Sequence, residues 1–130
     1  MRKEVVLSIA LIGLMALASH AQPGDEVKPE VAAKVRAAAE KYVKQETAVK
    51  GGFFLRDAAT GQVRDLRFDY VHNGVDLTPE NEYRVCVDFV DPSQNQLDVD
   101  FDLKPSASGE FEVTRIKVHK VKSGEKKESQ

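Results

Sequence analysis

Residues 83–103 read Tyr-Arg-Val-Cys-Val-Asp-Phe-Val-Asp-Pro-Ser-Gln-Asn-Gln-Leu-Asp-Val-Asp-Phe-Asp-Leu, and this stretch decides the fold. Apolar and polar side chains alternate on both sides of a polar loop. Alternation with a period of two is typical of a strand with one face on a core and the other in water. The stretch therefore predicts an antiparallel hairpin. Its core-facing residues are expected to be Tyr83, Val85, Val87, Phe89, Leu97, Val99, Phe101 and Leu103.

The overall composition indicates one small domain. The chain has 130 residues, a net charge of −2 and one cysteine. A chain of this length has room for one modest core. The near balance of charge argues against a nucleic-acid partner, which needs a basic surface. A single cysteine allows no internal disulfide.

The beginning of the chain has the pattern of a secretory signal peptide, residues 1–21. Two basic residues precede an apolar run at residues 5–18, and small residues follow at Ser19 and Ala21. We expect cleavage near Ala21 and a mature protein that is periplasmic or secreted. A retained membrane anchor is the alternative, but the apolar run is shorter than the roughly 20 residues that span a bilayer. We therefore expect no stable membrane anchor after cleavage.

A helix is predicted to open the folded domain after a flexible lead at residues 22–28. Pro29 suits a first helical turn because its missing N–H would be unpaired there, and Gly51 and Gly52 end the helical pattern. An apolar stripe at helical spacing makes this helix amphipathic. The stripe consists of Val31, Val35, Ala38 and Tyr42, widened by Ala39 and Val43.

Further strands are predicted on both sides of the central hairpin. One is at residues 53–55, one begins near Val63, and the last runs from Glu110 to about Val121. Turns are expected at residues 57–61, 72–74 and 105–109. Two shifts of phase predict irregularities: a bulge or a late start of the strand between Val63 and Leu66, and a bulge near Thr114 and Arg115. Residues 123–130 read as a disordered charged tail.

These elements give a single α+β domain at residues 29–122. One N-terminal amphipathic helix packs on one face of a four- to five-stranded antiparallel meander sheet. This order resembles the cystatin-like α+β folds and small exported bacterial proteins of unknown function. The cystatin inhibitor signature Gln-Val-Val-Ala-Gly is missing, and its nearest approach is Gln-Val-Arg-Asp-Leu at residues 62–66. The resemblance therefore concerns topology and does not imply protease inhibition.

Alternating aspartates form a ladder on the polar side of the hairpin. Asp98, Asp100 and Asp102 share that side with Asp88. Carboxylates two apart on a strand are about 7 Å from each other, which is too far for all of them to bind one calcium ion. The favoured interpretation is a solvated face with basic cross-strand partners. Those partners are expected among Arg67, Arg84, Arg115 and Lys117.

Cys86 and two histidines are the remaining residues with distinctive chemistry. A lone thiol can pair with another chain, bind a soft metal or act as a nucleophile, although an inert buried thiol is the commoner outcome. Together with His72 and His119, Cys86 could hold copper or zinc. Such a site needs three separate strands to converge, and the spacing alone gives no support for it.

No catalytic or cofactor-binding motif is present. The first hypothesis is a non-enzymatic, exported binding module that uses the exposed sheet face for a protein or small-molecule partner. Its candidate partner-binding residues are Arg67, Arg84, Asp88 and Asp100. The alternatives are copper or zinc handling through Cys86 and the histidines, and a small enzyme with a pocket between helix and sheet. The sequence leaves the oligomeric state open.

Overall fold

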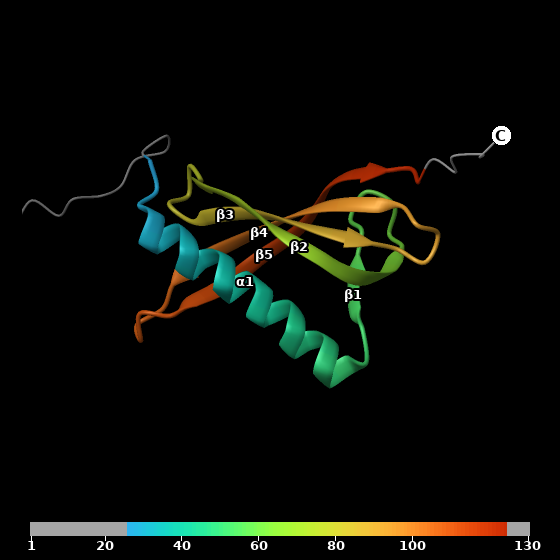
Figure 1. Cartoon of the computed structure of the whole chain (residues 1–130), viewed down its shortest axis with the longest axis horizontal. Helices are drawn as coiled ribbons and strands as arrows, with labels where there is room; N and C mark the ends of the chain where they lie inside the picture. The colour runs from blue at the N-terminus through green and yellow to red at the C-terminus, as the bar shows by residue number, and fades with distance from the viewer. Residues whose placement is uncertain (1–25, 125–130) are drawn as a thin grey trace, which may run out of the picture.

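The computed structural model describes residues 26–124, in which one helix lies against a five-stranded antiparallel sheet (Figure 1). Strands adjacent in the chain are adjacent in the curled sheet, so the meander and the α+β class are confirmed. The predicted signal peptide, most of the lead and most of the tail lie outside the described residues. The elements are α1 (Pro29–Lys50), β1 (Phe53–Arg56), β2 (Val63–Leu77), β3 (Tyr83–Val90), β4 (Gln96–Pro105) and β5 (Phe111–Lys122).

The two ends of α1 follow from local backbone chemistry. Pro29 occupies the first turn, and the carbonyl of Lys28 accepts the N–H of Ala32 at 2.9 Å. At the other end Gly51 adopts φ 76° and donates its N–H to the Thr47 carbonyl. Glycine takes this left-handed conformation without the penalty of a Cβ atom, which makes it a favourable helix terminator. No helix in the described part of the chain is long and apolar enough to cross a membrane.

The face of α1 that meets the sheet contains the whole predicted stripe and one further residue. Val35, Ala39 and Val43 are buried, together with Ala32, which the predicted stripe did not include. Side chains at these spacings lie on one side of a helix. Small alanines on that side allow the helix backbone to approach the sheet closely. The outer members of the predicted stripe are half-buried at its borders, namely Val31, Ala38 and Tyr42.

The core forms where α1 crosses the central hairpin. Seven of the eight core-facing residues predicted for the hairpin are at most 1% exposed, and Tyr83 is half-buried. Phe53 of β1 stacks on Phe89 with ring centroids 5.0 Å apart, and Tyr42 of α1 meets Phe101 edge-on. Each such buried side chain contributes about 1.5–3 kcal/mol relative to an exposed one. The prediction that α1 packs on the apolar side of the hairpin is confirmed.

The turn predicted at residues 72–74 is wrong, because β2 continues through it to Leu77. The register with β3 is interrupted between Val71 and Val75, so the polar residues are accommodated as an irregularity inside one strand. Arg36 of α1 donates to the Asn73 carbonyl at 2.9 Å and gives that oxygen a partner. The chain reverses later, where Thr78 and Glu82 join across a tight turn.

The bulge predicted near Thr114 is confirmed, whereas the one between Val63 and Leu66 is not. The β4–β5 register shifts between Asp102 and Leu103, leaving Thr114 as the extra residue. The β1–β2 register is continuous. Val63 is out of phase with Leu66 because its side chain points away from the core, where it is 58% exposed. A further shift between Asp98 and Val99 leaves His119 as an extra residue in β5. Sequence reasoning missed this last bulge.

Candidate functional site

The polar side of the hairpin forms what we call the open face, the face of β2–β5 opposite α1. Strand pairing places Arg84 opposite Asp102, Cys86 opposite Asp100 and Asp88 opposite Asp98. The expectation of a solvated face is wrong for Asp88 and Asp102, which are each only 2% exposed, whereas Asp98 and Asp100 are half-buried. Long side chains from the neighbouring strands of the curled sheet reach over these acids. The open face is therefore a partly buried polar layer.

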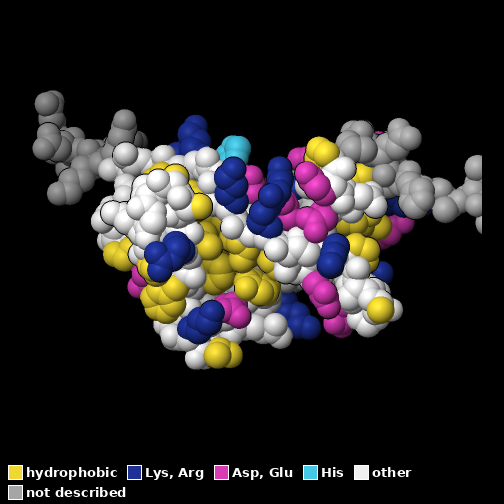
Figure 2. Space-filling view, turned by 180° about the vertical axis from the view of Figure 1, so that it is seen from behind, with side chains coloured by type: hydrophobic (Ala, Val, Ile, Leu, Met, Phe, Trp, Pro, Cys, Tyr) yellow, Lys and Arg dark blue, Asp and Glu magenta, His cyan; other side chains and the backbone are white. Residues whose placement is uncertain are grey.

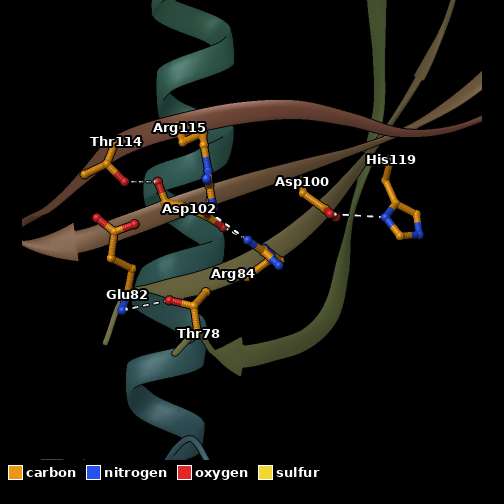
Figure 3. A network of polar contacts seen from close by, with 8 residues as sticks. All are labelled: Thr78, Glu82, Arg84, Asp100, Asp102, Thr114, Arg115 and His119. Carbon is orange, nitrogen blue, oxygen red and sulfur yellow. Dashed lines mark hydrogen bonds and ion pairs between the residues drawn. The ribbon is translucent and has the colours of Figure 1, made fainter. Parts of the chain in front are cut away.

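Asp102 lies between two arginines at one end of the open face (Figure 3). Arg84 donates to both carboxylate oxygens at 2.7 and 3.0 Å, and Arg115 donates twice to Oδ2 at 3.0 and 2.9 Å. Burial acts to raise the pKa of Asp102, but the hydrogen bonds from both guanidinium groups outweigh it and hold that pKa below its usual range. Asp102 is therefore an ionised structural anchor.

Asp88 is held in a similar way further along β3. Its Oδ1 lies 2.7 Å from His72 Nε2, and its Oδ2 accepts from Gln96 Nε2 at 3.0 Å. Tyr70 stacks on the His72 ring at a centroid distance of 5.0 Å. Burial opposes ionisation of Asp88, yet the contact with His72 and neighbouring hydrogen bonds lower its pKa. The imidazole is thus fixed over the middle of the open face.

Cys86 lies beside His72 and Asp88. The three side chains form a cluster in which a thiol, an imidazole and a carboxylate could each bind a metal ion. One donor atom from each of His72, Cys86 and Asp88 lies within 4.8 Å of the others. Donor atoms around one tetrahedral zinc ion are about 3.3–3.8 Å apart, given bonds of about 2.0–2.3 Å. The most distant of these atoms therefore need to approach one another by at most about 1–1.5 Å to share an ion. His72 Nε2 and Asp88 Oδ1, which are 2.7 Å apart, would instead have to separate slightly. Two adjacent strands supply the cluster.

The thiol of Cys86 is poorly suited to nucleophilic chemistry. Burial, followed by the negative charges of Asp100, Asp98 and Asp88, raises its pKa to about 11. The thiolate is the nucleophilic form, so the free thiol is nearly inert at neutral pH. A metal ion changes this balance because it displaces the thiol proton on binding.

His119 does not join the cluster. Its Nδ1 lies 3.3 Å from Asp100 Oδ2. His119 is itself the extra residue of the second bulge in β5. The structure therefore brings together two of the three predicted metal candidates, and Asp88 takes the place of His119. The sequence places Asp88 on the same strand face as Cys86, and this shared face is the signal by which Asp88 could be recognised as a metal candidate rather than a partner-binding residue.

The four predicted partner-binding residues are mostly engaged inside the protein. Arg84 is bound to Asp102, Asp88 to His72, and Asp100 lies against His119. Arg67 is exposed on β2. The predicted complementarity between acidic and basic strands is confirmed, because Asp98, Asp100 and Asp102 face Lys120, Lys117 and Arg115 of β5. Seen from behind, basic and acidic side chains stand interleaved above a central group of hydrophobic ones (Figure 2).

Several open grooves run beside α1, and two of them have volumes of about 600 Å³ or more. One, of about 600 Å³, lies between the second half of α1, β2 and the β3–β4 loop, and includes Val43, Leu66 and Phe68. The other, of about 670 Å³, lies between α1 and the start of β5 and includes Tyr42 and Phe111. Among the described residues, the metal-type cluster of His72, Cys86 and Asp88 belongs to neither groove. We take the open face as the candidate site because it contains the convergent group of metal-ligand side chains.

Comparisons with models of protein families, with curated proteins and with solved structures found no match. The function is therefore argued from the geometry of the open face.

Proposed function

We propose that this protein is a non-enzymatic binding module that works outside the cytoplasm and holds a divalent transition-metal ion on its open face. The observation that carries the proposal is the convergence of His72, Cys86 and Asp88 within 4.8 Å. A thiolate, an imidazole and a carboxylate suit borderline ions such as Zn²⁺ or Cu²⁺.

The environment of the three residues supports this proposal. His72 is held by Asp88 on one side and by Tyr70 on the other, so its ring is already oriented. Cys86 is half-buried and has no second cysteine in the chain with which to form a disulfide. The raised pKa of Cys86 argues against a nucleophilic role, and a metal ion bound here would have to displace the thiol proton.

The ion pairs of the open face favour a metal over a large partner as the ligand. A protein partner docking through Arg84, Asp88 and Asp100 would have to replace contacts that these side chains already make inside the chain. An ion of atomic size needs only a small rearrangement of the cluster. A protein partner is consequently the secondary form of the binding-module proposal, with Arg67 as its exposed candidate.

The remaining parts of the proposal rest on sequence pattern. A signal peptide at residues 1–21 would place the mature chain in the periplasm or outside the cell without a stable membrane anchor. A helix that precedes an antiparallel meander supports an N-terminal amphipathic helix and kinship with the cystatin-like folds. The intact mass of exported protein tests cleavage near Ala21, and a mass that retains residues 1–21 contradicts it.

Metal binding can be tested with purified mature protein stripped of metal by a chelator. Titration with Zn²⁺ in competition with a colorimetric chelator should show one bound equivalent. Cys86→Ser and His72→Ala should each weaken binding at least about 10-fold because each removes one ligand. His119→Ala is the matched control, since His119 contacts Asp100 outside the cluster. Failure of both Zn²⁺ and Cu²⁺ to bind, or binding unaffected by Cys86→Ser and His72→Ala, would overturn the proposal.

A further inference from the structure

Asp98 has a buried oxygen that the rest of the open face does not explain. Its Oδ1 has less than 1 Å² of accessible surface and no hydrogen-bond partner among the described residues. The other oxygen, Oδ2, lies 3.6 Å from Lys122 Nζ. A buried carboxylate oxygen without a donor is costly because it has lost water and gained nothing in return. Such an atom therefore indicates a missing partner.

Asp98 faces one member of the cluster of His72, Cys86 and Asp88, although it lies outside the group of donor atoms within 4.8 Å of one another. Asp98 on β4 is directly opposite Asp88 on β3 and lies on the same face. Residues paired in this way have Cβ atoms about 4.5–5.5 Å apart. Two facing carboxylates repel each other unless a proton or a cation lies between them. Both oxygens of Asp88 have hydrogen-bond partners and Lys122 lies near Oδ2 of Asp98, so Oδ1 of Asp98 is the oxygen of this facing pair that is left without a partner.

We propose that Asp98 is the fourth ligand of the metal site and completes a four-coordinate set with His72, Cys86 and Asp88. This inference rests on the proposed function and adds the identity of the ion. The set contains one sulfur, one nitrogen and two carboxylate groups. Two carboxylates favour a divalent ion such as Zn²⁺, whereas Cu⁺ prefers thiolates and thioethers. The site is therefore a Zn²⁺ site that discriminates against Cu⁺.

The test compares Asp98→Asn with Asp100→Asn. Both positions are on β4 and on the same face, but Asp100 is paired with Cys86 in the register and contacts His119. Asp98→Asn should weaken Zn²⁺ binding about 10- to 100-fold, while Cu⁺ affinity changes less than about 3-fold. Asp100→Asn should change Zn²⁺ affinity less than about 3-fold. Replacing Zn²⁺ with Co²⁺ gives a second readout, because loss of a ligand alters the visible absorption spectrum.

The metal-free proteins separate a ligand from a structural residue. The substitution Asp98→Asn removes the repulsion from Asp88, so the metal-free variant should melt at or above the temperature of the wild-type protein. Its increase in melting temperature on adding Zn²⁺ should be smaller than that of the wild type, since tighter binding of a ligand gives a larger stabilisation. A metal-free Asp98→Asn variant that melts well below the wild type would show a structural role and overturn the inference.

The two proposals fail in different ways. If Zn²⁺ binds through Cys86 and His72 but Asp98→Asn has no effect on affinity or on the Co²⁺ spectrum, the fourth ligand is wrong and the metal site stands. If the wild-type protein binds neither Zn²⁺ nor Cu²⁺, both proposals are wrong.

Discussion

Arg84 and Asp102 contact each other at two points across β3 and β4, with Nε–Oδ1 at 2.7 Å and Nη2–Oδ2 at 3.0 Å. The carboxylate is 3% exposed, while the arginine side chain is 38% exposed. The buried carboxylate of Asp102 is therefore bound by the guanidinium group of Arg84, whose side chain extends over it from the surface. This arrangement explains how Asp102 can be buried in the middle of a sheet and still be ionised.

We expect the two arginines that hold Asp102 to be partly redundant. Arg84→Ala should lower the free energy of unfolding by about 1–3 kcal/mol, since Asp102 keeps Arg115 as a partner. Arg115→Ala should cost less, because Arg115 is more exposed and its contact is screened by water. The double variant should cost more than the sum, because it leaves a buried carboxylate unpaired. Urea unfolding of the four proteins measures these differences.

The control for this cycle is Lys117→Ala, at an exposed position opposite Asp100. It should change the free energy of unfolding by less than about 0.5 kcal/mol. Strict additivity of Arg84→Ala and Arg115→Ala would contradict the shared role assigned to the two guanidinium groups.

Acid should destabilise the protein through Asp102. The pKa of this carboxyl lies below its ordinary value of 3.8 in the folded state. A lowered pKa contributes stability that is fully present above the unfolded value and is lost as pH falls through the folded value. Stability should therefore be nearly constant near neutral pH and fall from about pH 5 downward. Urea midpoints measured from about pH 7 to about pH 3 give the profile.

Asp102→Asn should flatten part of that acid profile, because the variant has no carboxyl to protonate at this position. Asp69→Asn, at an exposed position on β2, should keep the wild-type profile. An Asp102→Asn profile identical in shape to the wild type would mean that other carboxyls, such as Asp57 or Asp91, carry the whole effect.

The single thiol should react slowly in the folded, metal-free protein. At pH 8 about a tenth of a thiol with the ordinary pKa of 9.0 is thiolate, against about a thousandth at a pKa of about 11. Alkylation of Cys86 by iodoacetamide should therefore be about 100-fold slower in native than in urea-unfolded protein. Mass spectrometry follows the reaction without ambiguity, because the chain has one cysteine. Equal rates in both states would contradict the burial of Cys86.

Close packing of α1 on the sheet should make Ala39 intolerant of larger side chains. Ala39 is 0% exposed, so Ala39→Leu should destabilise by about 1–3 kcal/mol through overpacking. Ala33→Leu, at an exposed position of the same helix, is the matched control and should be nearly neutral. Thermal unfolding of both variants decides the point. A similar loss of stability in Ala39→Leu and Ala33→Leu would contradict the close contact between Ala39 and the sheet.

Much of the fold could be predicted from local sequence patterns. The period of two in residues 83–103 predicted both hairpin strands and their core faces, and the phase shift after Val113 predicted the bulge at Thr114. A similar shift between Val118 and Val121 marks the second bulge at His119 and could have been recognised in the same way. The turn predicted at residues 72–74 failed because pairing with β3 and a contact from Arg36 outweighed local turn preference.

The sequence by itself determined which residues face the core and which share the open face, because side-chain alternation along a strand is a local property. Only the tertiary structure decided that His72 meets Cys86 and Asp88, since that contact depends on the β2–β3 register and on two irregularities within it. Burial of Asp88 and Asp102 was likewise decided by side chains that reach in from other strands. The alternation along one strand contains no information about which side chains of other strands will cover it. The burial of the acids and the convergence of the metal-ligand side chains both depend on those neighbours.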